Sequence, residues 1–276
     1  MIKVGLLGYP LSHSFSKKLF NCLRDNFGFL IEYENFSVPS GEVDQFFQFA
    51  LENLHGFNIT VPYKEKPFER LEIFTIDDVA AKIGAVNVTR RLDGRFEAFN
   101  TDHIGFIKPI VNFKFRSALI FGAGGAARAV IYALINHGVE KTRVFNRTRE
   151  RALKLKKKFQ LIEVLEERDR KYALLEADIV VNATSLGLLG EAFYPLRKLD
   201  FQPNLQGKIF YDLIYNPPVT DFLRYGNERG AVTINGLKML LFQAVENIKI
   251  WTGENASTEV IKCSEFLQQE SPTENI

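Results

Sequence analysis

Cysteine is scarce in this chain, and the sequence also lacks the patterns of a metal-binding or membrane protein. Two cysteines, Cys22 and Cys263, stand far apart among 276 residues, and neither they nor the four histidines have metal-ligand spacing. We therefore expect buried thiols in a reduced, cytoplasmic protein, with no disulfide and no metal site. No apolar run reaches the length of a transmembrane helix, and the apolar start of the chain is too short for a secretory leader.

The chain also lacks a large excess of positive or negative charge. The chain has 35 Lys and Arg against 33 Asp and Glu, a formal net charge of +2, which argues against nucleic acid or an anionic membrane as a partner. The length and 46% hydrophobic residues are enough for two globular domains. The partner we expect is a small-molecule substrate, and the expected assembly is a monomer or a homodimer.

A glycine-rich turn between an apolar strand and a helix is the most informative motif present. Residues 117–128 read SALIFGAGGAAR. Gly122 permits a tight turn, Gly124 lets backbone N–H groups approach a pyrophosphate, and the small Ala127 lets the helix pack on the strand. The positive end of that helix favours phosphate, so the motif predicts a dinucleotide site.

The next strand, residues 142–145, lacks an acid at its tip. A carboxylate there normally binds the ribose 2′-hydroxyl of NAD, but this chain has Asn146, Arg147 and Thr148 instead. The planar guanidinium of Arg147 suits a 2′-phosphate, so NADP is the predicted cofactor. The alternative is that Arg147 is an ordinary solvated arginine at the start of a helix.

Strands and helices alternate along the chain, which predicts an α/β fold with two domains. Strands at residues 2–7, 31–38 and 56–61 and helices near 16 and 43–52 indicate a mostly parallel N-terminal sheet. Two further strands, residues 85–91 and 95–99, flank Asp93 and Gly94 and predict a hairpin that closes this domain. A doubly wound, Rossmann-like domain follows over residues 102–236, with strands at 118–121, 143–145, 179–181, 209–211 and 232–234. Helices at 237–251 and 257–268 have no strand left to connect, so residues 237–276 should return to residues 1–101.

Polar residues gather where the strands of the first domain end, and we expect them to line a substrate cleft between the domains. They are Ser12, His13, Ser14, Ser16, Asn58, Thr60, Lys64, Asn87, Asn100, Thr101 and Asp102. Hydroxyl and amide groups suit a polyhydroxylated ligand, and a hydride carrier needs a partner that manages the proton on the substrate oxygen. Lys64 with Asp102 is the pair we favour for that role. The structural alternative is a surface lysine and a helix-capping aspartate.

These residues resemble the shikimate dehydrogenase family, over residues 5–243. The matching motifs, in chain order, are SHSFS at 12–16, FNITVPYK at 57–64, GAVN at 84–87, NTD at 100–102, GAGGAAR at 122–128, NRT at 146–148, NATSLG at 182–187, DLIYNP at 212–217 and NG at 235–236, followed by Met239 and Gln243.

The resemblance implies NADPH-dependent, reversible reduction of 3-dehydroshikimate to shikimate, a step of aromatic amino-acid and chorismate biosynthesis. It implies that Ser14, Ser16 and Tyr215 bind the substrate carboxylate, that Thr60, Asn87 and Gln243 bind ring hydroxyls, and that Lys64 and Asp102 are catalytic. The residues it assigns to NADP are Gly122, Ala123, Gly124, Gly125, Ala126, Ala127, Asn146, Arg147, Thr148, Thr184, Ser185, Leu188 and Gly236.

Four positions depart from the family pattern: Lys17 for proline, Val88 for threonine, Asn235 for aspartate and Leu188 for methionine. We expect activity with altered affinity. Two alternatives remain, a quinate/shikimate dehydrogenase that accepts NAD and a catalytically silent relative that senses NADP or a metabolite.

Overall fold

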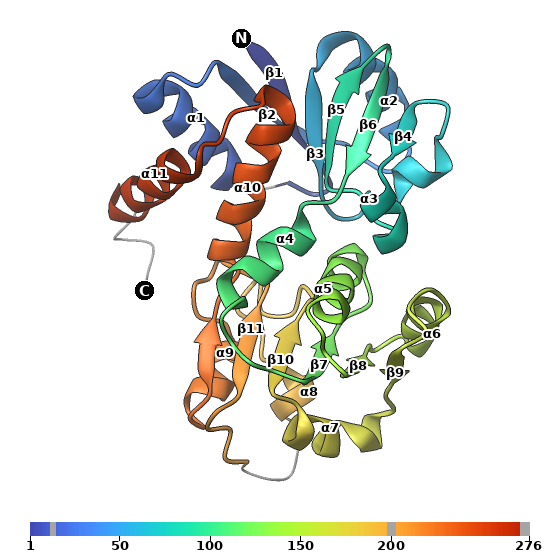
Figure 1. The fold of residues 1–276 in the computed structure, drawn as a ribbon, viewed down its shortest axis with the longest axis vertical. Coiled ribbons are helices and arrows are strands. Elements are labelled where there is room, and N and C mark those ends of the chain that lie inside the picture. The colour runs from blue at the N-terminus through green and yellow to red at the C-terminus, as the bar shows by residue number, and fades with distance from the viewer. Residues whose placement is uncertain (12–14, 198–202, 271–276) are drawn as a thin grey trace. The chain divides into compact units, whose positions relative to one another are not determined.

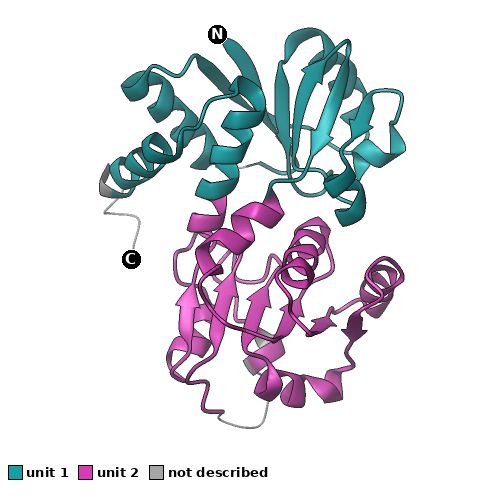
Figure 2. Cartoon of the chain, viewed as in Figure 1, with its two compact units in different colours: residues 1–101, 241–276 teal, residues 102–240 magenta. Residues whose placement is uncertain are grey.

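The chain forms two compact units in a computed structural model that describes residues 1–11, 15–197 and 203–270. Unit 1 is Met1–Thr101 with Leu241–Ile276, and unit 2 is Asp102–Leu240 (Figure 2). The sequence predicted the return at residue 237. It comes at Leu241, because helix α10 (Leu237–Thr252) places Met239 in the core of unit 2 and Ala244 and Ile248 in the core of unit 1.

Unit 1 is built on a six-stranded mixed sheet with the order β2-β1-β3-β5-β6-β4 (Figure 1). Its strands are β1 (Ile2–Gly8), β2 (Ile31–Ser37), β3 (Gly56–Ile59), β4 (Phe74–Ile76), β5 (Val88–Leu92) and β6 (Arg95–Phe99). Its helices are α1 (Phe15–Phe27), α2 (Val43–Asn53), the 3₁₀ turn η1 (Lys66–Glu69), α3 (Asp78–Ile83), the later turns of α10, and α11 (Ser257–Glu270). Strand β4 has only three residues and was not predicted.

The predicted hairpin forms, but it does not close the sheet. Asp93 (φ 49°) and Gly94 (φ 77°) are both left-handed, as a two-residue turn between right-twisted strands requires. Strand β5 pairs antiparallel with β3, and β6 pairs parallel with β4, so the hairpin lies inside the sheet and β4 forms the edge.

The prediction of free thiols was wrong. Cys22 on α1 and Cys263 on α11 form a disulfide, with their Cα atoms 5.8 Å apart. The two helices pack together because the C-terminal segment returns to unit 1, a contact between residues 241 positions apart that cysteine spacing cannot reveal. In the chain-entropy model, closing so long a loop lowers the conformational entropy of the unfolded chain. The folded state is thereby stabilised by roughly 5 kcal/mol.

Unit 2 is a doubly wound sheet of six parallel strands in the order β12-β11-β10-β7-β8-β9. The strands are β7 (Ser117–Phe121), β8 (Lys141–Phe145), β9 (Ile162–Val164), β10 (Ile179–Asn182), β11 (Ile209–Asp212) and β12 (Val232–Ile234). The helices are α4 (Asp102–Ile107), η2 (Lys108–Ile110), α5 (Gly125–Asn136), α6 (Arg149–Lys158), η3 (Glu167–Asp169), α7 (Arg170–Glu176), α8 (Tyr194–Arg197) and α9 (Asp221–Asn227). The short strand β9 was missed by the sequence pattern. Strand order reverses between β7 and β10, where such sheets bind dinucleotides.

Each sheet is buried on both faces. In unit 1, α2 packs with Phe57 and Phe96 on one face, while α1, α10 and α11 cover Val4 and Tyr33 on the other. In unit 2, α5 covers one face and α7 and α9 the other. Of the helices in the described ranges, none is both long and apolar enough to span a bilayer.

Candidate functional site

The glycine turn lies at the point where the strand order of unit 2 reverses. Gly122 has φ 115°, and a Cβ there would lie 2.6 Å from the carbonyl oxygen of Ala183, which follows the neighbouring strand β10. The turn therefore requires glycine both for its backbone conformation and for its close approach to β10. It brings the ends of β7 and β10 together.

The N-terminus of α5 is open to an anion. Gly124 occupies the N-cap position with no side-chain cap, is exposed, and would place an added Cβ in open space. The first N–H groups of the helix are therefore not satisfied by a capping side chain. Ala127 is fully buried against the sheet. This arrangement fits a pyrophosphate, with Gly122, Ala123, Gly124, Gly125, Ala126 and Ala127 around it.

The tip of β8 presents an exposed cation. Asn146 Nδ2 donates to the carbonyl of Thr148 (2.8 Å), which folds the turn, and Arg147 is exposed. Among the residues the structure describes, Arg147 makes no ion pair. Arg143, on the same strand, is buried and bonded to Glu163 and Glu176, so its guanidinium is already used. Arg147 fits a 2′-phosphate.

Residues 183–188 follow β10 and are held by side chains; we call them the nicotinamide loop because the family resemblance assigns Thr184, Ser185 and Leu188 to the cofactor. Thr184 Oγ1 donates to Asn182 Oδ1 (2.6 Å) and accepts from the N–H of Leu186 (3.1 Å). Ser185 and Leu188 are exposed. Glu191 was not predicted; its Oε2 accepts from the N–H groups of Gly187 (3.1 Å) and Leu189 (3.0 Å), and backbone hydrogen bonds lower its pKa. In the sequence, the signal that could have identified Glu191 was a carboxylate a few residues after Gly187.

Gly236 packs closely against the loop after β11. An added Cβ would lie 2.1 Å from the carbonyl oxygen of Leu213, and the Gly236 N–H donates to Ile214 (3.0 Å). Asn235 accepts from the N–H of Leu237 (3.2 Å), so an amide at this position still supplies the acceptor that aspartate would.

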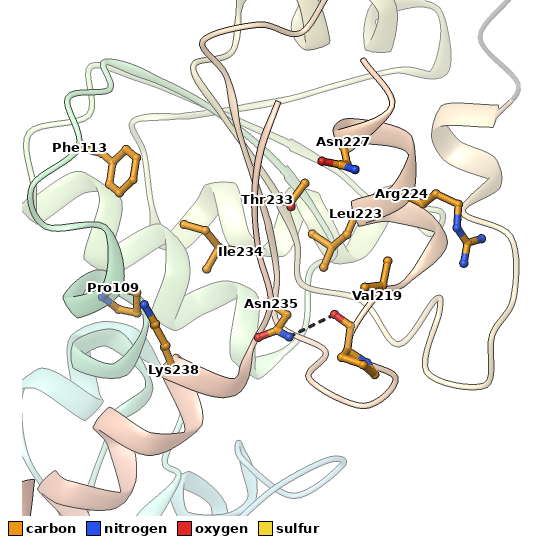
Figure 3. Close-up of a pocket in the computed structure, with 11 residues that line it drawn as sticks. Pro109, Phe113, Val219, Leu223, Arg224, Asn227, Thr233, Ile234, Asn235 and Lys238 are labelled. Carbon is orange, nitrogen blue, oxygen red and sulfur yellow. Dashed lines mark hydrogen bonds between the residues drawn. The ribbon is translucent and has the colours of Figure 1, made fainter. Parts of the chain in front are cut away.

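A cavity of about 520 Å³ lies beside these residues in unit 2, between η2, α9 and the edge strand β12 (Figure 3). Figure 3 shows Asn235 donating to the carbonyl of Pro218 at its rim (3.1 Å). The lining residues include none of the predicted site residues, so the cavity does not mark the predicted site.

Amide and hydroxyl groups in unit 1 form a buried network around Asn87, which lies just before β5. Asn87 Nδ2 donates to Thr101 Oγ1 (2.9 Å) and to Gln243 Oε1 (3.1 Å), while Asn87 Oδ1 accepts from the N–H of Thr101 (2.7 Å). Two predicted substrate ligands, Asn87 and Gln243, are therefore in contact although 156 positions apart. Two more residues extend the network: Asn58 Nδ2 donates to the Asn87 carbonyl (3.0 Å), and the Thr101 hydroxyl donates to Asn247 Oδ1 (2.8 Å).

The remaining predicted residues are distributed over both units. In unit 1, Thr60 follows β3, Lys64 is half-buried after it, and Ser16 is half-buried on α1. In unit 2, Asp102 is buried at the start of α4 and Tyr215 is half-buried after β11. Ser12, His13 and Ser14 lie outside the described residues.

Two departures from the family pattern have structural explanations. Lys17 forms an ion pair with Glu34 on β2 (2.6 Å), so it links α1 to the sheet where a proline could not. Val88 is fully buried, and a threonine there would bury a hydroxyl.

Comparison with known proteins gives one consistent result. Residues 6–89 match the family model for the shikimate dehydrogenase substrate binding domain, and residues 107–189 match that for shikimate / quinate 5-dehydrogenase. The shikimate dehydrogenase (NADP(+)) of Caldicellulosiruptor saccharolyticus is 38% identical over 262 residues, 91% of this chain and 92% of its own.

Solved structures agree. The crystal structure of shikimate dehydrogenase from Aquifex aeolicus has a TM-score of 0.81 and 33% identity, covering 95% of this chain and 97% of that one. The Thermus thermophilus shikimate 5-dehydrogenase, solved in complex with NADP(H) and shikimate, has a TM-score of 0.81 and 30% identity, with 96% and 99% coverage.

Proposed function

Because this chain belongs to the shikimate dehydrogenase family, we propose that unit 1 supplies most of the substrate-binding residues, and that unit 2 supplies the NADP-binding residues together with Asp102 and Tyr215. The protein is an NADP-dependent oxidoreductase that interconverts 3-dehydroshikimate and shikimate. The observation that best supports the division of roles is the contrast between the two units. Unit 1 gathers neutral hydrogen-bonding groups around Asn87, while unit 2 offers the open α5 N-terminus and the exposed Arg147.

For the cofactor, we propose that the α5 N-terminus binds the pyrophosphate and that Asn146, Arg147 and Thr148 bind the 2′-phosphate. The nicotinamide loop and Gly236 would border the nicotinamide. Bound NADPH supplies the hydride, and the protein supplies orientation and proton transfer.

For the substrate, we propose that Ser14, Ser16 and Tyr215 bind the carboxylate and that Thr60, Asn87 and Gln243 bind the ring hydroxyls. Amide side chains both donate and accept, which suits hydroxyl groups. Lys64 is the proposed proton donor to the carbonyl oxygen, which becomes negative as hydride arrives, and Asp102 is its carboxylate partner.

Replacing Gln243 with alanine tests the substrate assignment. We expect the KM for shikimate to rise about three- to tenfold, the effect of one neutral hydrogen bond, with the KM for NADP unchanged. Lys249→Ala, an exposed position on the same helix, is the matched control and should leave both constants unchanged. Steady-state kinetics at saturating co-substrate measures both KM values. A rise in the KM for NADP alone would reject the proposed role of Gln243 in substrate binding.

We propose a cytoplasmic enzyme, because the reaction belongs to a biosynthetic pathway, and a monomer or homodimer. In that reducing compartment burial would slow the attack of other thiols on the Cys22–Cys263 disulfide, since Cys22 is 8% exposed and Cys263 fully buried.

A further inference from the structure

A buried carboxylate joins two loops of unit 2 at the carboxyl ends of its strands. Asp212, the last residue of β11, is fully buried. Its Oδ1 accepts from Asn182 Nδ2 (2.9 Å) and from the N–H of Ile214 (3.0 Å), and its Oδ2 accepts from Thr220 Oγ1 (2.5 Å). We call residues 213–220 the tyrosine loop, because they carry Tyr215. The Asp212 side chain thus contacts Asn182, just before the nicotinamide loop, and also Ile214 and Thr220, near the two ends of the tyrosine loop.

The contacts continue into the nicotinamide loop. Asn182 Oδ1 accepts from the N–H (3.0 Å) and the hydroxyl (2.6 Å) of Thr184, and Asn182 Nδ2 also donates to the carbonyl of Leu186 (3.1 Å). Asp212 therefore fixes which way the Asn182 amide faces, because only the NH₂ group can donate to a carboxylate. With the amide reversed, Thr184 would face a donor instead of an acceptor.

We propose that Asp212 is a positioning residue that holds the nicotinamide loop and the tyrosine loop in the arrangement that binds NADP. The inference rests on the proposed function, because it takes residues 184–188 as the nicotinamide site. Asp212 touches neither cofactor nor substrate in this role. It acts through Asn182 on one loop and through Ile214 and Thr220 on the other.

Burial makes ionisation of Asp212 costly. Burial raises the pKa of Asp212 to about 6, although its bonds to Thr220, Ile214 and Asn182 act in the opposite direction. A carboxyl group with a raised pKa binds its proton more tightly in the folded state, so its contribution to stability falls as pH rises between its unfolded value and about 6. Above that range the ionised carboxylate stabilises the fold less than the protonated acid would, and groups with such perturbed pKa values concentrate at functional sites.

Asp212→Asn tests the proposal at pH 8, where the wild-type carboxylate is ionised. The amide is nearly the same shape, but its NH₂ group cannot accept the hydrogen bond that the Thr220 hydroxyl donates to Oδ2 in the wild type, so that hydroxyl loses its carboxylate acceptor. We expect the KM for NADPH to rise about tenfold, as for loss of one hydrogen bond to a charged group, while Tm stays unchanged or rises.

Asp178→Asn is the matched control. Asp178 is a carboxylate of the same unit that accepts from the N–H groups of Arg116 (2.9 Å) and Ser117 (3.0 Å), but it lies just before β10, at the opposite end of the sheet. This variant should leave the KM for NADPH unchanged. An equal rise in both variants, or a KM within twofold of wild type for Asp212→Asn, would overturn the proposal.

Two further variants keep the result interpretable. Thr220→Val removes the hydroxyl that bonds Asp212 and should raise the KM for NADPH. Thr220→Ser keeps the hydroxyl and should leave this KM unchanged. Equal KM values in these two variants would overturn the proposal even if Asp212→Asn fails to fold. Thr184→Val perturbs the nicotinamide loop directly. If it raises the KM for NADPH and Asp212→Asn does not, the positioning role alone fails; if neither does, the assignment of residues 184–188 fails.

Discussion

Replacing Lys64 with alanine will lower kcat by about 10²–10⁴, the range for loss of a general acid–base group, with little change in the KM for NADPH. The carbonyl oxygen of the substrate gains negative charge as hydride is transferred, and the lysine ammonium is the proposed source of the proton. Without it, water must protonate the oxygen. Single-turnover and steady-state rates of shikimate oxidation and 3-dehydroshikimate reduction measure the effect.

The backbone around Lys64 is well fixed, which makes this test specific to its side chain. The Lys64 carbonyl accepts from the N–H of Val86 (2.7 Å), and the preceding Tyr63 is buried with its hydroxyl bonded to the Val38 carbonyl (2.5 Å). Lys66→Ala, which removes a nearby lysine paired with Glu69, is the control and should keep wild-type turnover. Lys64→Arg should stay slow, because a guanidinium does not release its proton. Unchanged turnover in Lys64→Ala would remove lysine from the mechanism.

Replacing Arg147 with alanine will raise the KM for NADPH far more than the KM for NADH. A hydrogen-bonded charge pair with the 2′-phosphate contributes roughly 1.5–3 kcal/mol, which corresponds to about 10- to 150-fold in affinity. NADH has no such phosphate, so its binding should not respond. Initial rates with each cofactor at saturating substrate give the ratio.

Neighbouring arginines provide the control for this second prediction. Arg149 and Arg151 are exposed on α6, close to the tip of β8 in sequence. Alanine at either position changes the net charge equally and should leave the NADPH to NADH preference near the wild-type value. If Arg147→Ala raises both KM values together, its role is structural, which is the ordinary alternative for an arginine at a helix start.

Much of the fold follows from local signals. The apolar run ending at Gly122 predicted β7, its glycine turn and α5, and Asp93-Gly94 predicted the hairpin turn. The strands that were not predicted are β4 and β9, each three residues long, where too few residues alternate to identify a strand; β12, equally short, was predicted.

Other features depend on contacts between distant residues, which no local pattern contains. The position of the hairpin inside the sheet depends on how β4 pairs, and the disulfide depends on the packing of α11 on α1. In the candidate site, the sequence motifs included Asn182 and Asp212 without a role. Their bond joins two strands 30 positions apart, and only the fold reveals it.

The most direct test of the central claim is an initial-rate assay of the purified protein with shikimate or quinate, each with NADP or NAD, followed by reduced-cofactor absorbance. We expect turnover confined to shikimate with NADP. Strong use of quinate or NAD would instead indicate a broader shikimate/quinate dehydrogenase, and NADP binding without turnover would contradict the catalytic role and support a silent sensor.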